Sequence, residues 1–136
     1  MIINFMTNKI KIIKCRDVHG KESEASLDKF RFRPSVYGVL IEGEKILLSR
    51  QWDGYDFPVG GIEIDETIKE ALKREFIEET GIEVEPVMPV HCETDFFNPD
   101  NTDKYKGQYW NAVMMYYLVK KVGGELTKDN LYDTEQ

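Results

Sequence analysis

Cysteine and histidine are scarce in this sequence, which contains two residues of each among 136. Cys15 and Cys92 lie far apart, and neither belongs to a CxxC or a Cys/His spacing. The scarcity excludes a disulfide framework and a zinc site of that kind, and it favours two reduced thiols in a cytoplasmic protein. We expect His19 and His91 to have structural or surface roles.

Long hydrophobic runs are also missing. The longest unbroken apolar run covers eight residues, 112–119, whereas a membrane-spanning helix needs about 18 or more. Residues 1–6 lack the basic start and the cleavage site of a secretory signal peptide. The sequence therefore predicts no membrane association and no secretion.

An excess of basic residues is absent as well. The chain has 18 Lys and Arg against 25 Asp and Glu, a formal net charge of −7. Because nucleic-acid binding depends mainly on neutralising phosphates, the balance argues against a general nucleic-acid binder. A small anionic substrate stays compatible, provided that a cation or a few local arginines offset the repulsion.

What is present is enough for one domain spanning residues 1–136, with 41% hydrophobic residues and no repeats. Alternation and turn residues predict strands around a single helix. The expected elements are a strand at 9–15, a hairpin of 36–41 and 45–48, a loop at 54–61, a helix at 65–80, and strands at 84–92 and 108–122. This order predicts a mixed α+β domain.

The predicted helix carries carboxylates on its apolar side. Asp65 is placed to cap its start, and Gly81 stands where a left-handed C-cap belongs. At about 100° per residue, Glu75 and Glu79 continue the stripe formed by Ile68, Ala71 and Leu72.

Partly buried carboxylates repel one another and lose hydration, so they need a compensating partner. A basic side chain is one candidate, and Arg74 can brace an edge of the cluster. A hard divalent cation with oxygen ligands is the other. The helical wheel alone leaves two alternatives open, a metal site and an ordinary solvated acidic face.

A known motif surrounds these carboxylates. Gly60 is followed after five residues by Glu66 and after seven more by residues 74–82, which read Arg-Glu-Phe-Ile-Glu-Glu-Thr-Gly-Ile. This stretch resembles the box of the Nudix hydrolase (MutT-like) family at every fixed position. The neighbouring hairpin with Leu47-Leu48-Ser49-Arg50, the aromatic-Pro-x-Gly-Gly loop and the later strands resemble the family too.

The resemblance implies an α/β/α sandwich of mixed sheets and a hydrolase that acts on nucleoside diphosphates linked to another moiety. It implies Mg²⁺ or Mn²⁺ as the cofactor, with Glu75, Glu78 and Glu79 as metal ligands. One of these glutamates, or another acid of the site, would activate water. The same resemblance gives Arg74 the task of orienting the glutamates, and Glu66 a supporting role.

The sequence departs from the family pattern in two regions. Val59 replaces the first glycine of the common Pro-Gly-Gly loop, and Asp65 replaces a common glycine before Glu66. After the strand at 108–122 only residues 123–136 remain, too few for the usual C-terminal strand and helix. The domain is either pared down, truncated, or completed by a neighbouring subunit. Asp133 and Glu135 are the candidates in this region for a further metal or base residue.

The substrate is defined only by class, a small nucleoside diphosphate derivative. Arg33 and Arg50 are candidates for phosphate contacts, and Tyr55, with Trp52, Tyr109 and Trp110, for stacking on a base. Packing inside the protein is the alternative for each aromatic residue. A non-catalytic module that binds a nucleotide or ADP-ribose is the alternative function.

The strand at 108–122 is apolar on both faces, which is normal for a covered interior strand. Because residues 123–136 are mostly polar, a monomer would leave an apolar patch. The sequence therefore predicts a homodimer, which would use this strand or the N-terminal strand at 10–13.

Overall fold

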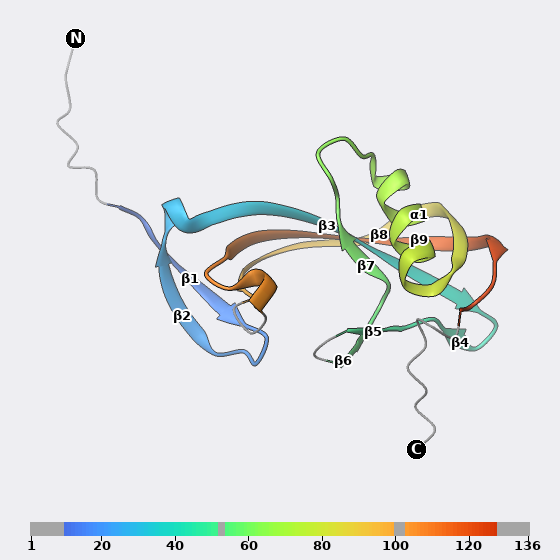
Figure 1. The fold of residues 1–136 in the computed structure, drawn as a ribbon, viewed down its shortest axis with the longest axis horizontal. Helices are drawn as coiled ribbons and strands as arrows, with labels where there is room; N and C mark the ends of the chain where they lie inside the picture. The colour runs from blue at the N-terminus through green and yellow to red at the C-terminus, as the bar shows by residue number, and fades with distance from the viewer. Residues whose placement is uncertain (1–9, 52–53, 100–102, 128–136) are drawn as a thin grey trace, which may run out of the picture. The chain divides into compact units, whose positions relative to one another are not determined.

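The computed structural model describes residues 10–51, 54–99 and 103–127. These residues form two compact units, one of residues 10–32 with 95–99 and 103–111, the other of residues 33–51 and 54–94 with 112–127. The elements in chain order are β1 (Ile12–Asp17), β2 (Glu22–Ser26), β3 (Phe30–Glu42), β4 (Lys45–Ile46), β5 (Ser49–Gln51), β6 (Gly54–Asp56), β7 (Val59–Gly61), α1 (Ile68–Thr80), β8 (Ile82–Asn98) and β9 (Tyr109–Gly124) (Figure 1). Two short 3-10 turns cover Leu27–Lys29 and Asp103–Tyr105.

The first unit contains a hairpin that the sequence predicted only in part. Strands β1 and β2 are antiparallel, and the buried residues Ile13 and Ala25 face each other across them. The connecting turn has Gly20 at a φ of 77°, and the Asp17 carboxylate accepts hydrogen bonds from two backbone N–H groups of that turn. Strand β2 was missed because its sequence is polar and, apart from Ala25, it buries little.

The main sheet has the strand order β2-β1-β8-β9-β3-β4, and β7 also pairs with β3. The end of β8 runs parallel to β1, whereas β4 and β7 are antiparallel to β3. Strands β5 and β6 form a separate two-stranded sheet. The expected hairpin after β3 is confirmed, with Gly43 in its turn, and the expected loop at 54–61 contains the short strands β6 and β7.

The N-cap of the helix lies two residues later than predicted. Thr67, not Asp65, is the N-cap, because its side chain accepts the N–H of Glu70 while the Glu70 carboxylate accepts the N–H of Thr67. This reciprocal pair is a capping box, a signal that the sequence displays as Thr-x-x-Glu. The predicted C-cap is confirmed, since Gly81 has a φ of 78° and donates its N–H to the Ile77 carbonyl.

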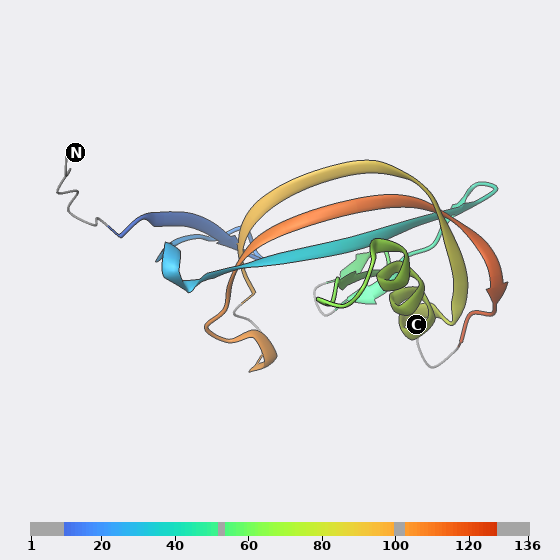
Figure 2. The same ribbon diagram turned by 90° about the horizontal axis from the view of Figure 1, so that it is seen from above.

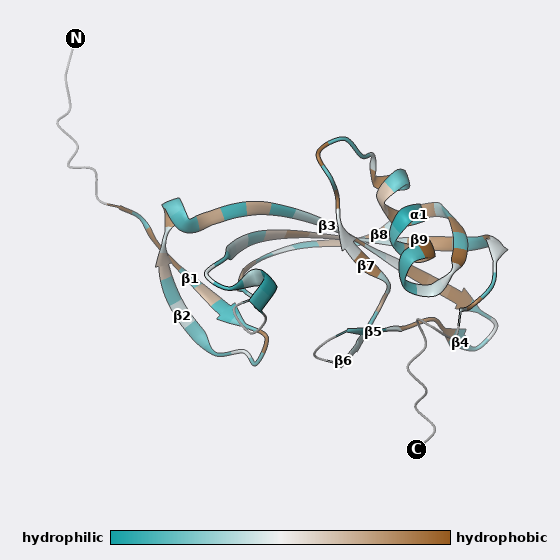
Figure 3. Ribbon diagram, viewed as in Figure 1, coloured by the Kyte–Doolittle hydropathy of each residue, from teal (hydrophilic) through white to brown (hydrophobic). Residues whose placement is uncertain are grey.

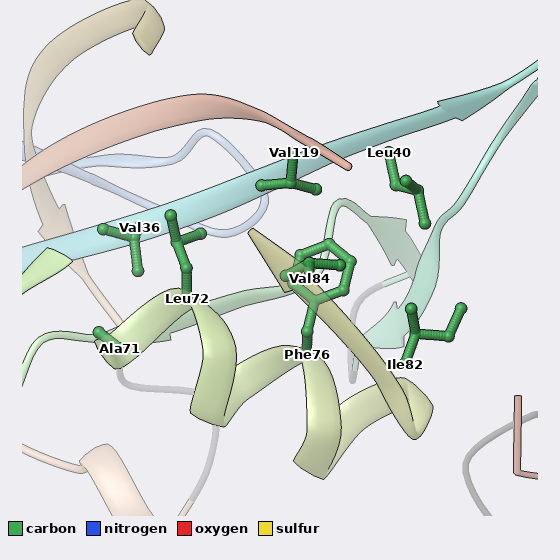
Figure 4. Close-up of a cluster of buried hydrophobic side chains, with 8 residues drawn as sticks. All are labelled: Val36, Leu40, Ala71, Leu72, Phe76, Ile82, Val84 and Val119. Atoms are coloured by element: carbon green, nitrogen blue, oxygen red, sulfur yellow. The ribbon is translucent and has the colours of Figure 1, made fainter. Parts of the chain in front are cut away.

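The core of the second unit lies between α1 and one face of the sheet. Leu72 and Phe76 point from the helix toward Val36 on β3 and Val119 on β9 (Figure 4). Among the described residues, the buried cluster contains Val36, Leu40, Ala71, Leu72, Phe76, Ile82, Val84 and Val119. Hydrophilic and hydrophobic residues alternate along the first part of β3 (Figure 3). Farther along the strand, Val36, Gly38 and Leu40 are buried and alternate with less buried residues, as expected of a strand with one buried face.

The α+β class predicted from the sequence is confirmed by a mixed sheet with one α-helix among the described residues. In the second unit α1 lies against one side of β3, β8 and β9 (Figure 2). Strand β9 is an interior strand, as predicted, between β8 and β3. Both β8 and β9 extend beyond their predicted ends. Among the described residues, no helix has the length and apolar character needed to cross a membrane.

Candidate active site

Glu79 reaches from the last turn of α1 toward the small sheet of β5 and β6. Its Oε2 accepts hydrogen bonds from Ser49 Oγ at 2.8 Å and from the backbone N–H of Val59 at 3.3 Å. Its Oε1 accepts one from Gln51 Nε2 at 3.4 Å. Thus a half-buried carboxylate is surrounded by three neutral donors from two different strands.

Burial raises the pKa of Glu79 above its ordinary value, because desolvation disfavours the charged form. The three donors act in the opposite direction, since they stabilise the carboxylate. The negative charge of Asp56 adds to the effect of burial. The balance leaves Glu79 as a carboxylate that binds a proton more readily than an exposed glutamate does.

Glu75 lies one turn earlier in α1, and its side chain is only 14% exposed. Its Oε1 accepts a hydrogen bond from Arg74 Nη1. A Cβ atom at Gly60 would come within 1.8 Å of its Cδ, so the glycine of β7 is what leaves room for the carboxylate. Burial raises the pKa of Glu75, although Arg74 acts against the increase. The sequence prediction that Glu75 and Glu79 are partly buried is confirmed.

Arg74 connects several carboxylates to the loop before the helix. Its guanidinium donates to both oxygens of Glu66, with a distance of 2.8 Å between Nη2 and Oε2, and to the Gly61 carbonyl at 3.1 Å. Its Nη1 lies 3.5 Å from Glu78 Oε2. The hydrogen bonds from Arg74 hold the pKa of Glu66 at about 2, well below its usual range.

The three glutamates expected to bind metal do not share one set of partners: Glu75 and Glu78 both contact Arg74 Nη1, whereas Glu79 contacts β5 and β7. Glu75 faces Arg74 and Gly60, Glu79 faces β5, and the Glu78 side chain is 59% exposed. Within residues 10–51, 54–99 and 103–127, no group of three or more His, Cys, Asp or Glu side chains is gathered closely enough to hold a metal ion. The helical wheel placed Glu75 and Glu79 on the apolar stripe of the helix, and both are partly buried, whereas Glu78 is exposed.

The donor set nevertheless fits a hard divalent cation. The three side chains offer only oxygen atoms, which Mg²⁺ and Mn²⁺ prefer. Burial already disfavours the charged forms of Glu75 and Glu79, so a nearby cation would be favourable to both. Assembling such a site requires at least one of these side chains to turn from its present partner.

The predicted substrate contacts occupy two places. Arg33 Nη1 lies 3.6 Å from the position that a Cβ of Gly61 would take. Because successive residues of a strand face opposite sides, Arg33 and Glu75 lie on opposite faces of β7. Arg50 and Tyr55 form a cross-strand pair in the small sheet, where Tyr55 is exposed. They face away from the side of β5 that carries Ser49 and Gln51.

The other predicted stacking residues have packing roles where the structure describes them. Tyr109 packs against Phe30, with ring centroids 5.4 Å apart, and the Trp110 indole N–H donates to Gln108 Oε1 at 3.0 Å. Trp52, Asp133 and Glu135 lie outside the described residues. His91 is exposed, and its Nε2 lies 3.2 Å from Glu93 Oε2, in keeping with the surface role expected for it.

Sequence reasoning missed Ser49 and Gln51, and it gave no place to a stacked pair of tyrosines, Tyr37 and Tyr116. The two rings are 4.4 Å apart on the sheet face away from α1, and burial raises the pKa of both hydroxyls. For Ser49 and Gln51, the sequence did contain a usable signal. Polar residues at positions i and i+2 share one face of a strand, and this strand leads directly into the glycine loop.

A family model described as the NUDIX domain matches residues 31–136. Among similar solved structures, an ADP-ribose pyrophosphatase from Streptococcus suis has 23% identity and a TM-score of 0.54 over 70% of this chain and 64% of its own. A UDP-X diphosphatase has 19% identity and a TM-score of 0.56 over 74% of this chain and 47% of its own. The ORF135 protein of E. coli has 25% identity and a TM-score of 0.55 over 74% and 69%. The chain thus spans less than two thirds of the length of the first two, and their likeness to it is one of fold.

Proposed function

The chain belongs to the NUDIX domain family, and from this membership we propose that it is a pyrophosphohydrolase. Its substrate would be a nucleoside diphosphate joined to another moiety, and the bond broken would be the diphosphate linkage. The observation that carries the proposal is the pair of partly buried carboxylates, Glu75 and Glu79, beside the glycine strand β7. Structural likeness to an ADP-ribose pyrophosphatase and a UDP-X diphosphatase supports it.

The side chains of the site divide the work between them. Glu75, Glu78 and Glu79 would hold Mg²⁺ or Mn²⁺, which when bound neutralises charge on phosphate oxygens and lowers the pKa of water. Arg74 keeps Glu66 and Glu75 in fixed positions beside the loop. A carboxylate whose pKa is raised by burial accepts a proton from water more readily than an exposed one, which suits Glu75 and Glu79 to the role of general base.

Substrate contacts are proposed on both sides of this centre. Arg33, beside Gly61, would contact a phosphate from the far face of β7. Arg50 and Tyr55, adjacent on the small sheet, would contact a second phosphate and a base.

A module that binds nucleotides without turnover is the second candidate. One observation favours it: in the described part of the chain, the acidic side chains are not gathered into a metal site. The retention of all three box glutamates favours the enzyme, because a binding module has no need of a complete catalytic set.

The test is a panel of nucleoside diphosphate derivatives, beginning with ADP-ribose and UDP-linked sugars, each incubated with Mg²⁺ or Mn²⁺. Release of two monophosphate products by the wild type, and its loss in Glu79→Gln, would support the pyrophosphohydrolase. Calorimetric binding without product would support the binding module. Neither turnover nor binding across the panel would overturn both.

A further inference from the structure

Two polar residues of β5 form a small hydrogen-bond network with Glu79. Ser49 is only 6% exposed, and its Oγ lies 2.8 Å from Glu79 Oε2. Gln51 Nε2 lies 3.0 Å from Ser49 Oγ and 3.4 Å from Glu79 Oε1. The three side chains therefore form a closed ring of contacts.

The protons of this ring can be counted. A serine hydroxyl has one proton and two lone pairs, and a glutamine amide has two N–H groups. The hydroxyl proton goes to Glu79, since the other acceptor within reach, the Asp56 carbonyl, is at 3.5 Å. The two amide protons of Gln51 then go to Ser49 and to Glu79. With Glu79 as a carboxylate, every donor of the ring has an acceptor.

The donors to Glu79 differ in kind from those to Glu75. Arg74 carries a positive charge, so it orients Glu75 and also neutralises it. Ser49, Gln51 and the Val59 N–H are neutral, so they orient Glu79 without supplying a counter-charge. A carboxylate held in this way keeps its charge available for a cation or for the proton of a water molecule.

We propose that Ser49 and Gln51 are positioning residues, which fix the carboxylate of Glu79 for the reaction. The inference rests on the proposed function, because Glu79 is assigned its role there. Outer hydrogen-bond partners of this type commonly contribute about 10–100-fold to activity. Ser49 makes the shorter contact and is the more buried, so it contributes the larger share.

The kinetic test compares Ser49→Ala and Gln51→Leu with the wild type. Each should lower kcat, Ser49→Ala by about 10–100-fold, while KM for the nucleotide changes little, since neither side chain is placed at the substrate. Ser49→Thr, which keeps the hydroxyl, should recover most of the loss. Ser35→Ala is the matched control, because Ser35 is a similarly buried serine on β3 and should leave kcat unchanged.

A double-mutant cycle separates positioning from a general structural role. In a Glu79→Gln background, Ser49→Ala should have little further effect on kcat, because Ser49 acts through the carboxylate that is already lost. An equal loss in both backgrounds would overturn the proposal. So would a Ser49→Ala enzyme with the kcat of the wild type.

The positioning role can also be tested by crystallography, without an activity assay. In crystals of the Ser49→Ala/Gln51→Leu variant, the Glu79 carboxylate should leave its wild-type position or occupy several rotamers. An unchanged, single rotamer would overturn the positioning role. If the wild type hydrolyses no compound of the panel, the proposed function fails, and the crystal structures still decide the inference. Should Ser49→Ala fail to fold, Gln51→Leu alone provides the same readouts, because Gln51 is less buried.

Discussion

Two glycines on neighbouring strands should respond in opposite ways to the same substitution. A Cβ atom at Gly60 on β7 would lie 1.8 Å from Glu75 Cδ and 1.9 Å from Glu75 Oε1. A Cβ atom at Gly38 on β3 would lie 1.9 Å from Phe76 Cε2 and 2.6 Å from Cζ. Neither glycine has a positive φ, so the backbone itself accepts alanine and only the neighbouring side chain decides the outcome.

In Gly60→Ala the obstructing group is the end of a flexible side chain. Glu75 can rotate away, at a conformational cost of about 0.5–1.5 kcal/mol, while loss of the glycine makes the unfolded chain less disordered by about 0.4–1 kcal/mol. The free energy of unfolding should therefore change by about 1 kcal/mol or less. The carboxylate, however, leaves its place, and a misplacement of about 1 Å costs on the order of 100-fold in kcat.

In Gly38→Ala the obstructing group is a fully buried ring that cannot move outward. Overpacking of a core costs about 1–3 kcal/mol, and Phe76 contacts both the helix and the sheet side of the cluster. The free energy of unfolding should fall by that amount. The three atoms nearest to the new methyl group all belong to Phe76 and none to Glu75 or Glu79, so kcat of the folded fraction should stay close to that of the wild type.

The assays are urea unfolding followed by circular dichroism, and initial rates on a substrate identified by the panel. A Gly60→Ala enzyme with normal kcat would refute the assignment of Glu75 to the site. A Gly60→Ala protein that is destabilised as strongly as Gly38→Ala would refute the argument from side-chain flexibility.

Thr67→Ala removes the capping box and should lower the free energy of unfolding by about 1 kcal/mol, measured by urea unfolding. Glu66→Gln should lower the free energy of unfolding at pH 7. Because the pKa of Glu66 is lowered to about 2, the difference in stability between the two proteins should be lost as the pH falls from about 4.5 toward 2. A stability difference that does not depend on pH would contradict the ion pair. Mg²⁺ or Mn²⁺ should raise the melting temperature of the wild type and much less that of Glu78→Gln, and an equal shift in both would place the metal elsewhere. Static light scattering at micromolar concentration should give the mass of a homodimer. Its interface would use the face of β9 away from α1 or the strand β1. A mass near the 15.9 kDa of one chain would exclude the homodimer.

The helix and the burial of its carboxylates could be predicted from the sequence because the pattern that determines them is local. The wheel placed Glu75 and Glu79 beside Ala71 and Leu72, and both are half-buried, since a period of 3.6 residues fixes which side chains share a face. The predicted cap, Asp65, was wrong, because the prediction rested on residue type alone. The reciprocal hydrogen bonds of Thr67 and Glu70 place the N-cap at Thr67.

Contacts between distant segments could not be predicted from the sequence. Ser49 and Glu79 are separated by 30 positions, and only the folded arrangement of β5 against α1 brings them together. The polar strand β2 was missed for a related reason, because its place depends on pairing with β1 and not on its own composition. The direction of the Glu78 side chain likewise depends on tertiary structure, since a wheel gives a face and not the partners on it.

The spacing of the box is explained largely by pairs of contacts. Gly60 leaves the space that Glu75 fills, Glu66 accepts from Arg74, and Gly81 ends the helix. Both pairs and the C-cap lie within the motif, so the motif positions the loop, Arg74 and Glu75 by itself. Glu79 is different, because its donors come from β5 and from the residue before Gly60. The box therefore supplies the carboxylate of Glu79 but not its orientation, and the residues of β5 are where this chain can adjust the site without changing the motif.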